Sequence, residues 1–179
     1  RLEAVFEGAS VQLDLPERRL RLAQAESASG ARYAGEGIVF WTKGSDQALL
    51  ERDGEQVECQ RVEGRSPWAE ARERGIGFRA VGNEPGWAAE VAMGEAPAMR
   101  LQLDYGQRVL DFPLALPLTE ENGGPGFRGE VGGTVGELRI RRGECIDGMS
   151  GERFGASAEV FVDGTRYAAG CGHYLFEFE

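Results

Sequence analysis

The chain has 179 residues, room for one domain or two small ones, and carries 30 acidic against 20 basic side chains. Its formal net charge of -10 at pH 7 disfavours nucleic acid and anionic membrane surfaces as partners and favours a basic partner, although acidity that serves only solubility explains the charge equally well. No apolar run is long enough for a membrane-spanning helix. The sequence opens at Arg1 without a methionine or a signal peptide, which is typical of a mature or trimmed chain.

Apolar residues occupy every second position in the first third of the chain, which is the period of β-strands. Pro16 marks a turn between two such segments, and Asp53-Gly54 is a strong hairpin signal between two more. The pattern predicts a meander of short antiparallel strands that closes as a small barrel or a curled sheet. Strands are expected at 11–15, 20–22, 38–41, 48–52 and 56–60.

Residues 63–75 interrupt this pattern and are predicted to link two domains. Turn residues precede Pro67, which suits the first turn of a helix, and 68–74 contains good helix formers. The predicted fold is therefore all-β, with two small antiparallel β-barrel or curled-sheet domains joined by a short linker and little helix. The expected domains are 1–62 and 76–179.

Strand patterns resume after the linker. Prolines frame 114–118, which favours an edge strand or an irregular connector. Seven glycines and a proline within 120–136 favour a long loop or bulged strands there. The other strands expected in this region are 77–81, 87–93, 99–104, 108–112, 137–142, 159–162, 165–169 and 174–179.

Two motifs in the first region carry the polar residues of greatest interest. They are SASGARY at 27–33 and FWTKG at 40–44, separated by a glycine-punctuated stretch suited to a chain reversal. A hairpin centred on Glu36 places Ser29 opposite Lys43. A hydroxyl and an ammonium at one end of a stiff hairpin suit carboxylates as binding partners. On spacing alone, an ordinary polar turn and an ordinary lysine-bearing loop are the simpler interpretation.

These motifs, together with Ala48-Leu49-Leu50, resemble the MliC/PliC inhibitors of c-type lysozyme, which are proteins of the bacterial envelope. The resemblance covers 1–62, about a third of the chain. It implies that loops carrying the two motifs enter the lysozyme cleft, where Ser29 and Lys43 engage the catalytic carboxylates. The residues expected to bind lysozyme are Ser27, Ser29, Gly30, Arg32, Tyr33, Thr42, Lys43 and Gly44.

The aromatic residues of the two motifs have two interpretations. Tyr33, Phe40 and Trp41 pack the stem of the hairpin, or one of them contacts lysozyme. Strand alternation favours Phe40 facing inward and Trp41 facing the opposite side, and a register change of one residue would exchange these faces.

The same resemblance implies a location in the periplasm or at the outer membrane of a Gram-negative bacterium. Family members often carry a lipidated N-terminal cysteine, so any membrane attachment is expected to run through a lipid that this chain does not contain. c-type lysozymes are typically basic, which fits the acidic composition of the chain and an electrostatically steered encounter.

The chain has three cysteines, an odd number for an exported protein. The resemblance places Cys59 at the later position of a family disulfide whose earlier cysteine has no counterpart here. We expect Cys145 to pair with Cys171, a bridge that would stabilise the fold by roughly 3 kcal/mol. Three reduced, buried thiols in a cytosolic protein are the alternative.

The second region has motifs of its own. GNEPGW at 82–87, CIDGMS at 145–150 and GCG at 170–172 resemble segments of a poorly characterised bacterial envelope family, which implies an exported location and no known reaction. A structural interpretation, with turns capped by their own polar side chains and a core tryptophan, is simpler than a binding site. The residues that could line a shallow polar pocket beside the disulfide are Asn83, Glu84, Trp87, Asp147 and Ser150.

Catalytic chemistry finds little support in the sequence. His173 is the only histidine, which removes any two-histidine metal site, and no nucleophile-elbow, zinc-protease, redox or phosphate-loop motif is present. We therefore predict that the protein is not an enzyme and uses neither a metal nor a cofactor. The sequence favours a proteinaceous lysozyme inhibitor of the envelope. The alternative is an envelope binding or structural module that recognises a cell-wall fragment, a small ligand or a partner protein.

Overall fold

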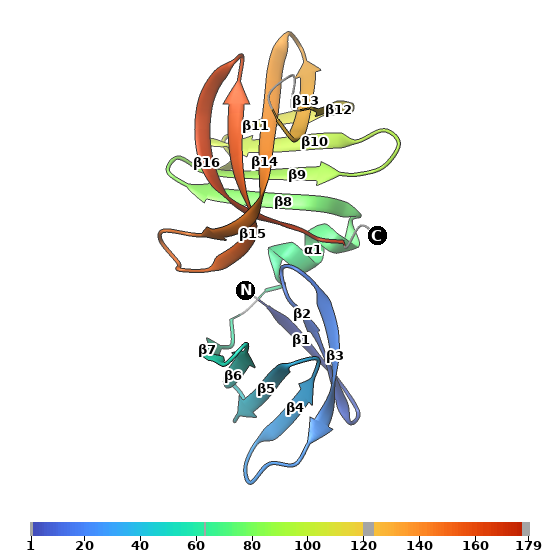
Figure 1. Ribbon diagram of the computed structural model, residues 1–179, viewed down its shortest axis with the longest axis vertical. Coiled ribbons are helices and arrows are strands. Elements are labelled where there is room, and N and C mark those ends of the chain that lie inside the picture. The colour runs from blue at the N-terminus through green and yellow to red at the C-terminus, as the bar shows by residue number, and fades with distance from the viewer. Residues whose placement is uncertain (1, 63, 120–123, 177–179) are drawn as a thin grey trace. The chain divides into compact units, whose positions relative to one another are not determined.

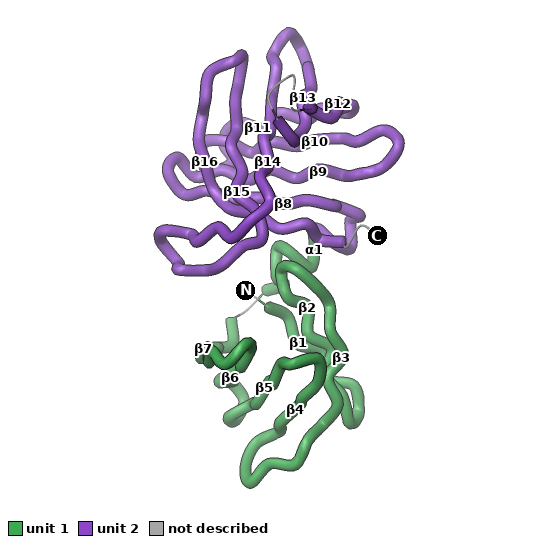
Figure 2. Tube along the Cα trace, viewed as in Figure 1, with its two compact units in different colours: residues 1–70 green, residues 71–179 purple. Residues whose placement is uncertain are grey.

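A computed structural model describes residues 2–62, 64–119 and 124–176 of the chain (Figure 1). The chain forms two compact units, residues 1–70 and 71–179 (Figure 2). The division falls inside the short helix α1, Pro67–Glu73, which lies within the expected linker segment. Strands dominate both units, and α1 with one 3-10 turn supplies all the helix in the described part of the chain. The predicted all-β class is confirmed.

The first unit is a curled sheet of seven antiparallel strands that follow one another in chain order (Figure 1). The expected hairpin at Asp53-Gly54 joins the last two strands. The meander predicted from the period-two pattern is therefore present. Its strands are β1 (Glu3–Glu7), β2 (Ser10–Asp14), β3 (Arg19–Ala25), β4 (Ala31–Gly35), β5 (Ile38–Lys43), β6 (Gln47–Arg52) and β7 (Glu55–Gln60).

One face of this sheet carries the core of the first unit, because alternate side chains of each strand point to the same side. Leu13 on β2 lies opposite Leu20 on β3, and Tyr33 on β4 lies opposite Phe40 on β5. Each fully buried apolar side chain contributes about 1.5–3 kcal/mol to folding. The buried members of this core are Val11, Leu13, Leu15, Leu20, Leu22, Tyr33, Ile38 and Phe40.

The β4–β5 hairpin turns on two residues, Glu36 and Gly37. Both have positive φ angles, 50° and 75°, as a tight type I′ turn requires. The strand register that follows from this turn places Ala31 opposite Thr42. The turn is thus centred between Glu36 and Gly37 instead of on Glu36, and the expected register of the hairpin is wrong by one residue.

This register changes the expected pairing at the open end of the hairpin. Ser29 does not lie opposite Lys43, because β4 begins only at Ala31. The faces of the hairpin are nevertheless as alternation predicts: Phe40 is buried, and Trp41 lies on the opposite face and is partly exposed.

The second unit is a nearly closed barrel of nine antiparallel strands in the order β11-β10-β9-β8-β16-β15-β14-β13-β12. β12 is an edge strand, as the prolines around it predicted. The elements are β8 (Ile76–Asn83), β9 (Gly86–Ala92), β10 (Ala98–Leu103), the 3-10 turn η1 (Asp104–Gly106), β11 (Arg108–Phe112), β12 (Ala115–Leu118), β13 (Gly126–Val131), β14 (Thr134–Ile146), β15 (Arg153–Val162) and β16 (Thr165–Tyr174).

Phe112, the last residue of the edge strand β11, packs against strands from the other end of the sheet. Its ring packs against Gly129 of β13 and Gly136 of β14, where an added β-carbon would lie 2.6 and 2.4 Å from the nearest Phe112 atom. Only glycine leaves room for the ring at these two positions. The edge strand β11 is thereby packed against the opposite end of the sheet.

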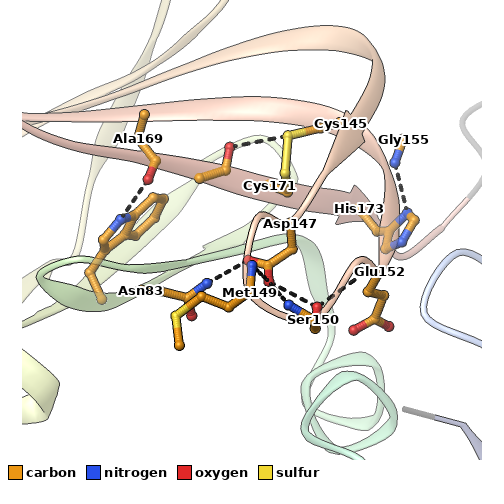
Figure 3. Close-up of a disulfide and its surroundings, with 12 residues drawn as sticks. Asn83, Cys145, Asp147, Met149, Ser150, Glu152, Gly155, Ala169, Cys171 and His173 are labelled. Atoms are coloured by element: carbon orange, nitrogen blue, oxygen red, sulfur yellow. Dashed lines mark hydrogen bonds between the residues drawn. A yellow bond between two sulfur atoms is a disulfide. The ribbon is translucent and has the colours of Figure 1, made fainter.

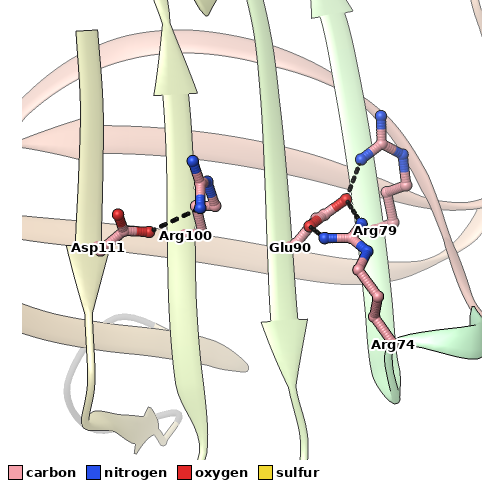
Figure 4. Close-up of polar contacts among 5 residues, drawn as sticks. All are labelled: Arg74, Arg79, Glu90, Arg100 and Asp111. Carbon is pink, nitrogen blue, oxygen red and sulfur yellow. Dashed lines mark hydrogen bonds and ion pairs between the residues drawn. The ribbon is translucent and has the colours of Figure 1, made fainter. Parts of the chain in front are cut away.

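The other face of the barrel wall holds a buried carboxylate. Glu90 alternates with the core residues of β9 and is 8% exposed. Arg74 donates to it at 3.0 and 2.8 Å, and Arg79 donates to it as well (Figure 4). Two guanidinium groups thus compensate the loss of water around the Glu90 charge.

The glycine-rich segment within 120–136, expected as a long loop or as bulged strands, forms β13 and the start of β14, which pair without a register shift. Its glycines serve the Phe112 contact and the turn at Gly132-Gly133; residues 120–123 lie outside the described part of the chain. The strand expected at the end of the chain is wrong in its bounds. The last strand ends at Tyr174 instead of continuing through 174–179. The Leu175 N–H still donates to the Gly77 carbonyl of β8 at 2.8 Å, but Leu175 and Phe176 form a bend instead of strand; 177–179 lie outside the described residues.

Candidate functional site

Ser29 and Lys43 lie at the same end of the β4–β5 hairpin. Ser29 belongs to the connection that enters β4, and Lys43 is the last residue of β5. The pairing of Ala31 with Thr42 brings these two chain positions together at the hairpin end. Both side chains are exposed, so a hydroxyl and an ammonium are open to a partner there.

Trp41 contacts both of these residues. Its indole Nε1 donates a 2.7 Å hydrogen bond to the carbonyl oxygen of Ser29. The Nζ of Lys43 lies 5.4 Å from the centre of the Trp41 ring, within range of a cation–π interaction. Trp41 and Lys43 are two positions apart on one strand, so their side chains share the outer face of the hairpin.

Side-chain hydroxyls hold the backbone of the entering loop. The Ser27 hydroxyl lies within donating distance of the carbonyl oxygens of Ser29, at 2.7 Å, and Gly30, at 3.0 Å. The Thr42 Oγ1 accepts from the Ala31 N–H at 3.1 Å and lies 3.2 Å from the Ala31 carbonyl, to which it can donate. The regular pairing of β4 with β5 ends at Ala31 and Thr42, and beyond it these side-chain hydrogen bonds hold the loop backbone.

The two glycines of the expected site differ in what they require. Gly30 has a φ of +66°, and a β-carbon on it would lie 2.0 Å from the Thr42 carbonyl oxygen. Gly44 has a φ of +76° but open space around it. Gly30 is therefore required by close packing and by backbone conformation, and Gly44 by conformation alone.

Arg32 and Tyr33 lie on opposite faces of β4. Arg32 is opposite Trp41, and its side chain is partly exposed on the outer face. Tyr33 is 5% exposed, with its ring centre 5.7 Å from that of Phe6. The structure therefore places Tyr33 in the stem of the hairpin, the first of its two interpretations, and leaves Arg32 beside the exposed end.

The charge on Lys43 is open to an incoming anion. Lys43 is the only lysine of the chain, because the remaining basic residues are all arginine. Within the described ranges, no carboxylate lies within ion-pair distance of its Nζ, and the Trp41 ring is the partner that the structure records. An exposed ammonium with a neighbouring hydroxyl can bind carboxylates through charge-assisted hydrogen bonds.

The second candidate cluster joins two turns of the barrel (Figure 3). The Asn83 side-chain amide donates to Asp147 Oδ2 at 2.6 Å. Asp147 Oδ1 accepts from the N–H groups of Met149 and Ser150, at 3.1 and 2.7 Å, and from the Ser150 hydroxyl at 2.8 Å. The Ser150 N–H contributes most to lowering the pKa of Asp147 below its ordinary value, and the Ser150 hydroxyl, Met149 and Asn83 add to it.

These contacts give the cluster a structural explanation. The Asp147 carboxylate caps its own turn and ties it to the β8–β9 turn. Trp87 is 4% exposed and donates to the Ala169 carbonyl at 3.3 Å, so it belongs to the core. Glu84 is exposed and precedes a cis peptide bond to Pro85. Asn83, Asp147 and Ser150 thus lie together as one hydrogen-bonded cluster.

The predicted disulfide between Cys145 and Cys171 is present, with Cα atoms 5.6 Å apart (Figure 3). Cys59 is a free, partly buried cysteine, and burial raises the pKa of its thiol.

His173 is 5% exposed, accepts a hydrogen bond from the Gly155 N–H at its Nδ1, and packs against Phe154. These contacts are those of a core histidine.

The described part of the chain contains neither a candidate metal centre nor a helix that could span a membrane. No three metal-ligating side chains come together there. The helices that the structure describes are too short to cross a bilayer.

The fold and this hairpin end define the first unit as an all-β domain with an exposed polar tip on a curled meander. Residues 1–58 match the family described as membrane-bound lysozyme-inhibitor of c-type lysozyme, MliC. Residues 1–58 thus form a lysozyme-inhibitor domain of this family, whose role is non-catalytic, and the rest of the chain has no family assignment. Neither a curated protein nor a solved structure matches the chain.

The contact made by Trp41 is the part of the site that sequence reasoning missed. The spacing of Trp41 and Lys43 on one strand was a visible signal for the ring–ammonium contact. The hydrogen bond to Ser29 depends on the path of the β3–β4 connection, for which the sequence has no local signal.

Proposed function

We propose that this protein inhibits c-type lysozyme by inserting the Ser29 and Lys43 end of the β4–β5 hairpin into the lysozyme active-site cleft. The observation that carries the proposal is the exposure of both side chains at one hairpin end within the region that matches the inhibitor family. The wider set of contacts comprises Ser27, Gly30, Arg32, Thr42 and Gly44.

The chemistry of the partner explains why an ammonium is effective. A retaining glycosidase such as lysozyme has two catalytic carboxyl groups about 5 Å apart, one acting as general acid. The Lys43 ammonium placed beside them interacts with both charges and lowers the pKa of the general acid, which disfavours its protonated, active form. The Ser29 hydroxyl donates a hydrogen bond to one of the carboxylates.

The rigidity of the tip favours tight binding. The Ser27 hydroxyl, the Thr42 hydroxyl and the Trp41 indole all fix the backbone around Ser29 before any partner arrives. A loop that is already ordered loses less conformational entropy on association. The acidic chain and a basic enzyme also attract one another over a longer range, which raises the association rate at low salt.

We also propose that the protein acts in the bacterial envelope. The matching family is described as membrane-bound, and the Cys145–Cys171 bridge is typical of an oxidising compartment. Fractionation of producing cells should place the full-length protein in the periplasm or with the outer membrane, and recovery in the cytoplasm with both cysteines reduced would contradict this.

The direct test is a titration of the full chain into a c-type lysozyme that is digesting bacterial cells. We expect the rate of clearing to fall to zero as the inhibitor approaches and exceeds the enzyme concentration. A lysozyme that is not of the c-type is a suitable specificity control. An unchanged clearing rate at a large excess of the protein would contradict the proposal.

A further inference from the structure

We propose that Trp41 is the positioning residue of the inhibitory tip, holding the Ser29 loop and the Lys43 ammonium in one fixed arrangement. This inference rests on the proposed function for its consequences in binding. Its structural part, the coupling of the two groups through one indole, can be tested without lysozyme.

The first half of the coupling is the hydrogen bond to Ser29. The connection that carries Ser29 lies outside the strand pairing, so its position depends on side-chain contacts. The Trp41 Nε1 donates to the Ser29 carbonyl at 2.7 Å, a short distance for such a bond. The indole therefore holds the Ser29 carbonyl in place, and with it the backbone that carries the Ser29 side chain and its hydroxyl.

The second half is the contact with Lys43. A lysine side chain has several rotatable bonds and loses much freedom when it is fixed. The Trp41 ring, 5.4 Å from the Lys43 Nζ, favours the rotamers that extend the ammonium over it. The same ring thus restricts the ammonium while its N–H restricts the hydroxyl.

Close packing makes this arrangement specific. Gly30 lies between the two groups, and a β-carbon on it would be 3.3 Å from the Trp41 Nε1. Since Trp41 is only partly buried on the outer face, its ring is not needed to fill the core on the inner face. Its contacts with Ser29 and Lys43 indicate that its role is to position these two residues at the hairpin end.

The binding test uses W41F, which keeps an aromatic ring beside Lys43 and removes the N–H that holds Ser29. We expect the inhibition constant of W41F to rise about fivefold, the range of one hydrogen bond. In an S29A background the same change should have an effect below about twofold, because the hydroxyl that Trp41 positions is already absent. In a K43A background it should keep its full effect.

Equal effects of W41F in the wild-type and S29A backgrounds would overturn the inference, because Trp41 would then act by direct contact with lysozyme or through stability. W87F is the matched control. It removes another indole N–H bond to a backbone carbonyl, in the second unit, and should leave the inhibition constant unchanged.

The lysozyme-free test exploits the single lysine. Reductive methylation with 13C-formaldehyde labels only Lys43 and the N-terminal amine, and it preserves the lysine charge. We expect the Lys43 methyl signal to be shifted upfield by the Trp41 ring and to move to the position of free dimethyl-lysine in W41L. We also expect 15N relaxation of residues 27–30 to report faster motion in W41F than in the wild type.

A Lys43 signal that is the same in W41L as in the wild type, together with unchanged relaxation of 27–30, would overturn the inference. That result says nothing against lysozyme inhibition itself. Conversely, a shifted signal in a protein that fails to inhibit lysozyme would overturn the proposed function and leave the coupling intact.

Discussion

Gly30 and Thr42 approach so closely that a β-carbon on Gly30 would lie 2.0 Å from the Thr42 carbonyl oxygen. This contact places the loop that carries Ser29 directly against the end of β5, beside Lys43. It makes the geometry of the tip depend on a residue that has no side chain of its own.

We therefore predict that G30A destabilises the first unit by about 3 kcal/mol. The substitution forces alanine into a left-handed conformation and pushes a methyl group into the backbone of β5. Urea unfolding followed by far-UV circular dichroism measures this change. G44A is the matched control, because Gly44 has a similar φ and open surroundings, and it should cost only about 1 kcal/mol. Equal losses for the two variants would contradict the close contact.

The Asp147 turn predicts a pH dependence in the second unit. Replacing Asp147 by alanine should lower stability at pH 7 by about 1–2 kcal/mol, since the N–H groups of Met149 and Ser150 lose their acceptor. The pKa of Asp147 is lowered in the folded state, so the ionised carboxylate stabilises the fold above its unfolded pKa of about 3.9. This stabilisation disappears as the pH falls through the lower, folded pKa.

Urea midpoints of wild type and D147A should accordingly differ at pH 7 and converge as the pH falls through the lowered, folded-state pKa of Asp147. D111A serves as the control, because its ion pair with Arg100 is exposed and should contribute less than about 1 kcal/mol at either pH (Figure 4). A gap between wild type and D147A that is independent of pH would show that the carboxylate charge has no role in the turn.

The Cys145–Cys171 bridge predicts a stability change that is separate from inhibition. Replacing both cysteines by serine should lower the unfolding free energy of the second unit by about 3 kcal/mol. The inhibition constant should not change, because the residues that we assign to lysozyme binding all belong to the first unit. C59S, at a cysteine that is free, is the control for replacing a thiol. A loss of inhibition in the double serine variant with its first unit still folded would argue for a binding role of the second unit.

Local patterns predicted the strands well because alternation at Val11, Leu13 and Leu20 reflects which side chains face the core. The turn between β4 and β5 was less certain, because Gly35 and Gly37 each allow a reversal and only strand pairing decides between them. One residue of register was enough to misplace Ser29 opposite Lys43. The prediction that Phe40 faces inward and Trp41 outward was correct, because it depends on alternation within β5 and not on the pairing with β4.

Features that depend on distant parts of the chain were beyond sequence reasoning. The glycines of 120–136 left a long loop and bulged strands both open, and only the fold shows that Gly129 and Gly136 are strand residues that accommodate Phe112 from another part of the barrel. The burial of Glu90 likewise depends on Arg74 and Arg79, which only the fold brings to it. The Trp41–Ser29 contact belongs to the same class, since it crosses from a strand to a loop that follows no regular pattern.

The most direct test of this account is the inhibition constant of K43A against a c-type lysozyme, with R21A as the control. Both variants remove one positive charge from the first unit, and Arg21 lies in an exposed ion pair with Glu7. We predict that K43A raises the inhibition constant about tenfold or more, a loss of about 1.4 kcal/mol, with no change in thermal stability, and that R21A has little effect. An inhibition constant for K43A equal to that of the wild type, in a correctly folded protein, would contradict the central role of the Lys43 ammonium.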